Sequence, residues 1–168
     1  MHDFISRISI NAVMARVVPF LFLAIFALPS LMASAAEDRA TPDQAIAMVH
    51  RVIADMKTSG KDSVIAEINT LSSKYRDRDL YVTVMDMNGK EIAHGANKKM
   101  QGISLIELKD TDGKEYIKER IELVKTKGKG WQDYKFVNPV TKQIEPKSMY
   151  FEKFGELIVS CGVYKPAS

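Results

Sequence analysis

A lysine and two tyrosines lie close together near the C-terminal end of the sequence, and their chemistry suits the binding of an acid. Tyr134 lies in GWQDYKF, and Lys147 and Tyr150 lie in EPKSMYF. An ammonium group supplies three donors and a positive charge, and phenol hydroxyls supply directional donors. Together they suit a small carboxylate in a partly apolar pocket. These three residues are therefore predicted to bind a ligand.

Two further residues complete the predicted ligand-binding set. Trp131, the single tryptophan of the chain, is either a pocket wall that shields the ligand from water or a large core residue. His94 either donates a hydrogen bond to the ligand or has a structural role at the end of a strand. Lys135 alternates with Tyr134 along the chain, and it is expected to be exposed to solvent.

Side-chain alternation sets a condition on this site. Lys147 and Tyr150 lie on opposite faces of a flat strand because they are three residues apart. They share a pocket only if the strand begins after Lys147, twists or carries a bulge. In the alternative interpretation, Tyr134 and Tyr150 are half-buried strand residues and Lys147 is exposed.

The sequence favours binding without catalysis. Residues 110–113 (DTDG) place the glycine too early for a calcium loop, and the later ligands of such a loop are missing. Cys161 has no second cysteine with which to form a zinc site. Neither Ser148 nor Ser160 lies in a G-x-S-x-G setting. We therefore predict no catalytic residue, no metal and no cofactor.

Charge and cysteine content narrow the class of protein further. The 168 residues include 24 Lys and Arg against 21 Asp and Glu, which gives a formal net charge of +3. The lysines are interspersed with acidic residues, so no nucleic-acid partner is predicted. Cys161 is the single cysteine, which excludes an internal disulfide, and we expect it to be a small core residue.

The first 35 residues have the features of a signal peptide. Arg7 and Arg16 precede the charge-free apolar run Val17–Leu31, and the small residues 33–35 (ASA) follow it. The run is shorter than the ~20 residues that span a bilayer, and two prolines interrupt it. Residues 1–35 are therefore predicted to be cleaved, which leaves one domain at residues 36–168 in the periplasm or outside the cell. The alternative is a retained membrane anchor.

Two helices are predicted at the start of this domain and a third near its middle. Residues 41–44 (TPDQ) form a capping box with proline at the first helical position, and the apolar stripe that follows ends at Gly60. A second helix begins near Asp62 or Ser63. A third begins at residues 112–115 and ends before Gly128. The amphipathic first helix could pair with a copy of itself, so a homodimer is a possible assembly.

Five strands complete the predicted fold. The dipeptide Asn88-Gly89 between two strand-like runs is a strong hairpin signal, because both residues tolerate a positive φ. Adjacent strands joined by tight turns form an antiparallel sheet, so the fold class is α+β. One helix is inserted between strands 2 and 3. The predicted strands are Leu80–Met87, Glu91–Ala93, Trp131–Val137, Lys147–Phe154 and Glu156–Tyr164.

The sequence resembles a single Cache domain of the type 2 group. The resemblance covers nearly all of Leu80–Lys165, and its most specific parts are GWQDYK and NPVTKQIEPKSMY. It implies an extracytoplasmic sensor domain with a PAS-like sheet, a long N-terminal helix and a short organic acid as ligand. Family members are commonly the outer part of chemoreceptors or histidine kinases. Because nothing follows Ser168 in this sequence, direct transmembrane signalling by this chain is not expected, and a separate membrane sensor protein is a possible partner.

Together, these features predict an exported, sensor-type domain that binds a short organic acid and does no chemistry on it. The alternative is a ligand-responsive subunit that docks on a separate membrane receptor or histidine kinase.

Overall fold

The structure is a computed structural model that describes residues 39–165. The predicted signal peptide lies outside these residues, so its cleavage stays a prediction. Within residues 39–165, no helix is long and apolar enough to cross a membrane. The helices are α2 (Pro42–Ser59), α3 (Lys61–Asn69) and α4 (Tyr116–Lys127), with the short 3-10 helices η2 (Ser73–Tyr75) and η3 (Lys98–Met100). The strands are β1 (Arg76–Asp77), β2 (Leu80–Asp86), β3 (Glu91–His94), β4 (Lys129–Val137), β5 (Ile144–Phe154) and β6 (Leu157–Tyr164).

The strands form one antiparallel sheet, as predicted for an α+β fold. The order across the sheet is β1-β2-β6-β5-β4, and β3 pairs with β2 on the edge away from β6, further along that strand than β1. All five predicted strands are present, and α4 lies between the second and third of them in the chain. The two-residue strand β1 is an addition that the sequence did not indicate. The sheet has six strands among the described residues.

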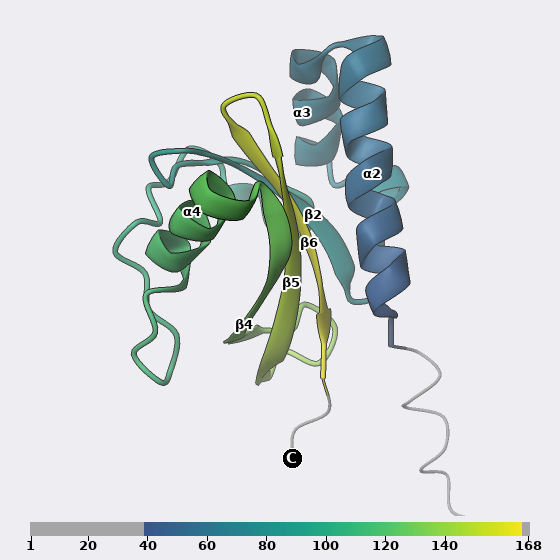
Figure 1. Ribbon diagram of the computed structural model, residues 1–168. Helices are drawn as coiled ribbons and strands as arrows, with labels where there is room; N and C mark the ends of the chain where they lie inside the picture. Colours follow the sequence, from purple (N-terminus) through teal and green to yellow (C-terminus); the bar gives the residue numbers. More distant parts are fainter. Residues whose placement is uncertain (1–38, 166–168) are drawn as a thin grey trace, which may run out of the picture. The chain divides into compact units, whose positions relative to one another are not determined.

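Helices cover both faces of the sheet (Figure 1). Helices α2 and α3 lie against one face, which we call the α2 face, and α4 lies against the other, which we call the α4 face. Neighbouring residues of a strand alternate between two separate apolar cores. Tyr150, for example, packs in the core under α2, and Phe151 packs in the core under α4.

Helix α2 begins with the predicted capping box. Thr41 Oγ1 accepts a hydrogen bond from Gln44 N, and Gln44 Oε1 accepts one from Thr41 N. The thiol of Cys161 on β6 donates to Met48 Sδ over 3.7 Å, so Cys161 is a core residue as predicted. Because the apolar stripe of α2 packs inside the domain, it leaves no apolar helix face for a second copy in this part of the chain. The homodimer stays a prediction. The buried residues of α2 are Ala45, Met48, Val49, Val52, Ile53 and Met56.

The hairpin between β2 and β3 contains a bulge that places two polar side chains on the same face of the sheet. The predicted hairpin is confirmed, but of the Asn88-Gly89 dipeptide only Gly89 has a positive φ, of +82°. The pairing register shifts between Val84 and Met85, which adds one residue to β3. As a result Glu91 and His94, three residues apart, line the same cavity on the α4 face.

Candidate ligand-binding site

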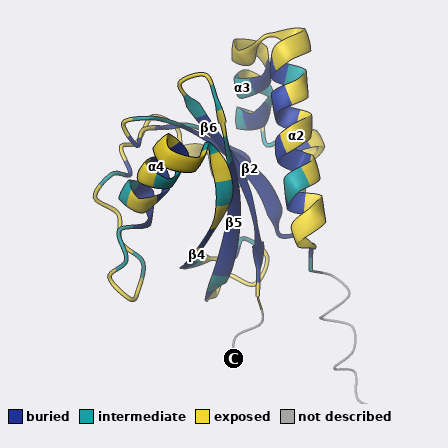
Figure 2. Ribbon diagram, viewed as in Figure 1, coloured by how far each residue is buried: buried dark blue, intermediate teal, exposed yellow. Residues whose placement is uncertain are grey.

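Polar side chains are buried together between the sheet and α4. They come from five strands and one helix, and Figure 2 shows the central strands β2, β5 and β6 as mostly buried. Burial of polar groups is unfavourable unless each finds a partner, so their hydrogen bonds decide what the site can do. The residues concerned are Tyr81, Glu91, His94, Arg120, Tyr134, Lys147 and Tyr164.

Lys147 lies at the centre of the sheet and is only 1% exposed. Its ammonium group donates to the hydroxyls of Tyr81 (2.7 Å) and Tyr164 (3.2 Å), and it lies 3.9 Å from the centre of the Tyr81 ring. A Cβ at Gly162 would come within 2.9 Å of Lys147 Cε, so the glycine makes room for the lysine stem. Burial lowers the pKa of Lys147 to about 7. The alternative interpretation of an exposed lysine is wrong.

The hydroxyls of Tyr81 and Tyr164 extend this hydrogen-bond network to the backbone. Tyr164 donates to the carbonyl of Val137 over 2.8 Å, and the Tyr81 and Tyr164 hydroxyl oxygens are 2.9 Å apart. Because the Tyr164 proton is used on Val137, Tyr81 must be the donor of the pair. Lys147 is therefore the first donor of a hydrogen-bonded chain that continues through Tyr81 and Tyr164. This chain fixes the position of the Tyr81 ring.

Arg120 projects from α4 toward the sheet and has an unsatisfied donor. Its Nε donates to Gln132 Oε1 over 3.0 Å, and its guanidinium lies 5.3 Å from the centre of the Tyr134 ring. The Tyr134 ring stacks on that of Tyr116 with 4.4 Å between centroids. Within the described residues, Arg120 Nη2 is buried without any hydrogen-bond partner. This cation can therefore accept an anionic partner from outside the chain.

His94 is neutral and has a fixed tautomer. Its Nδ1 accepts hydrogen bonds from the backbone amides of Ala96 (3.2 Å) and Asn97 (3.0 Å). Burial, and then the nearby Lys147, lower its pKa to about 4. The proton of the neutral ring is consequently on Nε2, which is a donor. The ring stacks on Tyr81 with centroids 4.9 Å apart.

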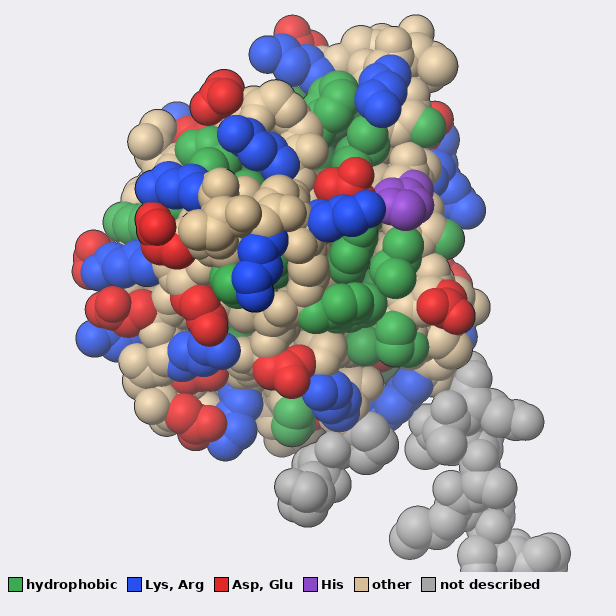
Figure 3. Space-filling view, viewed as in Figure 1, with side chains coloured by type: hydrophobic (Ala, Val, Ile, Leu, Met, Phe, Trp, Pro, Cys, Tyr) green, Lys and Arg blue, Asp and Glu red, His purple; other side chains and the backbone are tan. Residues whose placement is uncertain are grey.

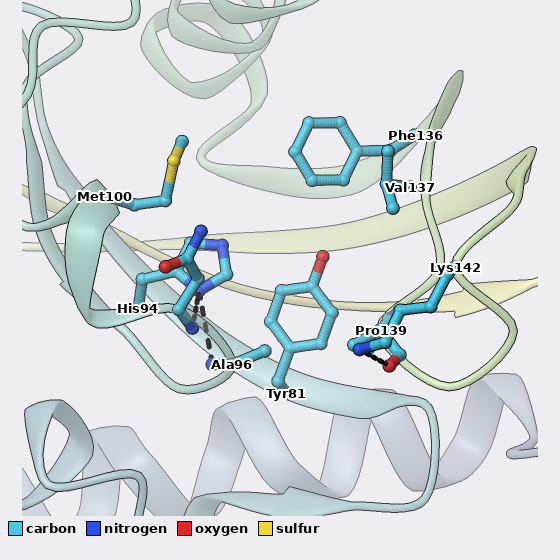
Figure 4. A pocket seen from close by; sticks show the side chains of 9 residues that line it. Tyr81, His94, Ala96, Met100, Phe136, Val137, Pro139 and Lys142 are labelled. Carbon is cyan, nitrogen blue, oxygen red and sulfur yellow. Dashed lines mark hydrogen bonds between the residues drawn. The ribbon is translucent and has the colours of Figure 1, made fainter.

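Two adjoining cavities open beside these groups. The outer one has a volume of about 400 Å³ and is seen in Figure 4, where Met100 and Phe136 lie across from each other above the ring of Tyr81. The inner one, of about 20 Å³, reaches Glu91, Arg120 and Tyr134. The residues that line both cavities are Tyr81, His94, Met100 and Phe136. A ligand in the outer cavity would therefore lie next to the buried charges of the inner one.

The structure brings together three of the five predicted site residues. Tyr134 and Lys147 are directly opposite each other on β4 and β5, and with His94 they lie on the α4 face. Trp131 and Tyr150 pair with each other but lie on the α2 face. Strand β5 begins at Ile144, before Lys147, and its register with β4 has no shift, so alternation is unbroken. The expectation that all five meet is wrong for Trp131 and Tyr150.

Trp131 lines a different groove, on the α2 face. Its side chain is 38% exposed, and the groove of about 650 Å³ also includes Asp133, Ser148 and the start of α2. Figure 3 shows hydrophobic side chains gathered there, between α2 and the strands. Tyr150 donates to Glu152 Oε2 over 3.0 Å and is otherwise a core residue. This groove presents no buried charged side chain within the described part of the chain.

Several important residues of the site were missed by sequence reasoning. Arg120 falls between Ile117 and Ile121 on the apolar stripe of α4, and a charged residue in such a position was the available signal. Glu91 is the first residue of the second hairpin strand and gave no signal, because the bulge that orients it is not visible in the sequence. Tyr81 and Tyr164 lie in apolar strand runs that resemble ordinary core segments.

Comparisons with known proteins agree with this architecture. The structure entitled "Structural basis for carboxylic acid recognition by a Cache chemosensory domain" is similar with a TM-score of 0.60 at 23% identity, covering 73% of this chain and 91% of that one. A methyl-accepting chemotaxis protein from Vibrio parahaemolyticus RIMD 2210633 has a TM-score of 0.62 at 20% identity, covering 73% and 86%. A periplasmic sensor domain of a chemotaxis protein has a TM-score of 0.58 at 21% identity, covering 73% and 88%.

These identities are low enough that the likeness concerns the fold. No curated protein is significantly similar to the chain. The family described as single Cache domain 2 matches residues 27–165, which is most of the sequence. Cache domains are sensor domains that bind ligands, and the polar pocket between sheet and helix lies within the matched range. The chain therefore belongs to the single Cache domain 2 family.

Proposed function

We propose that this chain is an exported sensor-type domain that binds a short organic acid in the cavities under α4 and leaves the acid chemically unchanged. The observation that carries this proposal is the buried, unsatisfied Nη2 of Arg120 at the inner cavity. An arginine stays charged at all relevant pH values, and a buried charge is costly until an opposite charge pairs with it. A ligand carboxylate would supply that charge.

The electrostatics of the pocket favour an anion. Arg120 and Lys147 are both buried on the α4 face, and no ion pair joins either of them to an acid within residues 39–165. Glu91 is the single acid that lines the inner cavity among those residues, and burial raises its pKa to about 8. At neutral pH the site therefore has an excess of positive charge.

The size and lining of the pocket favour a small ligand. A volume of about 400 Å³ is near the lower end for small-molecule sites. Met100 and Phe136 supply apolar walls, while His94 Nε2 supplies a donor. The similar domain whose title names carboxylic acid recognition supports the same ligand class. A short aliphatic acid meets these requirements with its carboxylate toward Arg120 and its carbon chain toward Met100.

We assign different tasks to the predicted residues. Arg120 binds the carboxylate, and His94 and Tyr134 line the ligand. Lys147 lines neither cavity, because the Tyr81 ring lies over its ammonium group. It contributes positive potential and positions Tyr81. Trp131 and Tyr150, on the α2 face, have no contact with this ligand.

Ligand binding can be tested by thermal unfolding with a panel of two- to four-carbon monocarboxylates, with matched amines and sugars as controls. A ligand that binds only the folded state at about a hundred times its Kd adds about 2.7 kcal/mol of stability, which visibly raises Tm. We expect at least one acid to do so. Arg120→Met should abolish the shift, whereas Lys125→Met, an exposed residue of the same helix, should keep it.

The panel can also contradict the proposal. If no acid raises Tm, small monocarboxylates are excluded as a class. A full shift in Arg120→Met would remove this arginine from the site. If the panel is silent, docking on a separate membrane receptor or histidine kinase would be the better function. Export is tested separately: N-terminal sequencing of the protein from its native host should begin at Ala36.

A further inference from the structure

Glu91 is a buried acid without a partner inside the proposed binding site. It is only 3% exposed, and Glu91 Oε1 is buried without a hydrogen bond among the described residues. Backbone bonds fix its position, since Glu91 N donates to Ile103 O (2.9 Å) and Gly102 N donates to Glu91 O (2.7 Å). The side chain is thus held at the inner cavity by the strand and by the loop after it.

A second glutamate with little solvent exposure shows which contacts keep a carboxyl group ionised in this protein. Glu145 is also little exposed to solvent, though it lies nearer the surface than Glu91, and it accepts hydrogen bonds from Arg39 (2.7 Å), Asn138 (3.0 Å) and Thr141 (2.6 Å). Burial alone would raise its pKa, yet these donors lower it to about 2. No donor reaches Glu91 from the rest of residues 39–165, so burial raises its pKa to about 8 and the neutral acid is the stable form at pH 7.

The neutral form of Glu91 is a donor without an acceptor. A protonated carboxyl group has one O–H, and Arg120 Nη2 is a second donor without an acceptor at the same cavity. A carboxylate has two oxygens that accept hydrogen bonds. One ligand group can therefore satisfy both donors at once, which neither an amine nor an apolar group can do.

We propose that Glu91, in its protonated form, donates a hydrogen bond to the carboxylate of the ligand, so that binding of the acid is linked to a proton on Glu91. This inference rests on the proposed function and adds a specific contact and a pH dependence to it. Arg120 supplies the positive charge that pairs with the ligand carboxylate. Glu91 supplies a second donor, which requires a second acceptor oxygen on the ligand.

The inner cavity must enlarge to admit the carboxylate. Its volume of about 20 Å³ holds roughly one water molecule. Met100, on η3, lines both cavities and is only partly buried, and a methionine side chain has three rotatable bonds. Movement of this side chain would join the two cavities and let the acid reach Glu91 and Arg120 together.

The charged groups around Glu91 determine the sign of the pH effect. Arg120 on α4 keeps its charge, and His94 on β3 is neutral above its pKa of about 4. The tyrosines at the cavity, from β2, β4 and α4, have raised pKa values and stay neutral. Above the pKa of Glu91, its carboxylate would repel the ligand. Lys147 on β5 also loses charge as pH rises, so the two groups must be separated by experiment.

Calorimetry with the acid that gives the largest Tm shift in the panel can separate them. For the wild type, Kd should rise about tenfold per pH unit above pH 8, since one proton must be taken up with the ligand. Titrations at pH 8.5 in two buffers of different ionisation enthalpy should show that uptake directly. Glu91→Gln keeps a donor but cannot ionise, so its uptake should vanish, whereas Lys147→Met should retain most of it.

The outcomes distinguish the two proposals. Acid binding without proton uptake, or uptake that persists in Glu91→Gln, would overturn the role of Glu91 and leave the proposed function standing. Absence of any acid binding at pH 6 would overturn both. The ligand-free protein offers an independent measurement: the carboxyl ¹³C resonance of Glu91 should titrate several pH units above that of Glu145. Titration of both near their ordinary values would also overturn the inference.

Discussion

The two faces of the sheet differ in the polarity of the side chains that are buried beneath their helices. Under α2 and α3 the core is apolar, and the tyrosine hydroxyls at its rim reach acids, as Tyr75 does with Asp55 over 2.9 Å. Under α4 an apolar core of similar kind encloses Arg120, Lys147 and Glu91, and two of these have unsatisfied polar atoms. The α2 face contributes stability, while burial of unsatisfied charged groups lowers the stability that the α4 face contributes.

Removing apolar volume from the α2 face should have the largest effect on stability. Ile68 on α3 is fully buried in that core. Ile68→Ala should lower the free energy of unfolding by about 2–5 kcal/mol, through lost burial and the cavity left behind. Urea unfolding measures this loss, and exposed Lys57→Ala should stay within about 0.5 kcal/mol. A loss below about 1 kcal/mol would mean that this face is not the stabilising one.

Removing a charge from the α4 face should have the opposite sign. Lys147→Met keeps most of the stem, and the Tyr81–Tyr164 hydrogen bond does not depend on the lysine. Because burial of a charge that has no ion-pair partner is costly, we expect its removal to stabilise the protein at pH 7. Thermal unfolding of the ligand-free protein measures it.

The pH dependence of this gain follows from the depressed pKa of Lys147, about 7. Between pH 7 and the ordinary lysine value near 10.5, the unfolded chain binds the proton and the folded chain does not. The wild type therefore gains stability as pH rises through this range. The advantage of Lys147→Met should be full at or below pH 7 and vanish near pH 10.5. A destabilised variant at pH 7 would show that the lysine supports the fold.

Crowding the hairpin that bears Glu91 should have a smaller effect. Gly89 has a positive φ, and a Cβ there would lie 3.1 Å from Ile106 and 3.2 Å from Ile117 on the α4 side. Gly89→Val should cost about 1–3 kcal/mol from backbone strain, plus the cost of this contact. Gly113→Val is a matched control, because Gly113 has the same φ of +82°, lies in a similar turn and has open space around it. Equal losses in urea unfolding would mean that the α4 side tolerates the crowding.

Much of the fold could be predicted because its signals are local. The capping box at Thr41 and the Asn88-Gly89 turn each act within a few residues, and both were found. The pairing of β6 with β2 could not be predicted, since these two strands are far apart in the chain. Sequence patterns carry no comparable information about such distant neighbours.

The site was less predictable than the fold. Alternation correctly separated Lys147 from Tyr150, and the twist or bulge that would have reunited them is absent from the β4–β5 register. Glu91 lies at the candidate site only because of the bulge in β3, and no residue type in the sequence predicts that bulge. Arg120 was not predicted from the sequence, because periodicity shows where a helix is apolar and does not show which charged residue lies within the apolar stripe.

Cys161 gives the α2 face a property of its own. Its thiol is fully enclosed beside Met48, and burial raises its pKa to about 12. The thiolate, which is the form that reacts, is thus almost absent while α2 stays on the sheet. In an oxidising compartment, chains that open at this helix would expose a reactive sulfur and could cross-link with one another. The rate at which Cys161 is oxidised or cross-linked would therefore report how often α2 separates from the sheet.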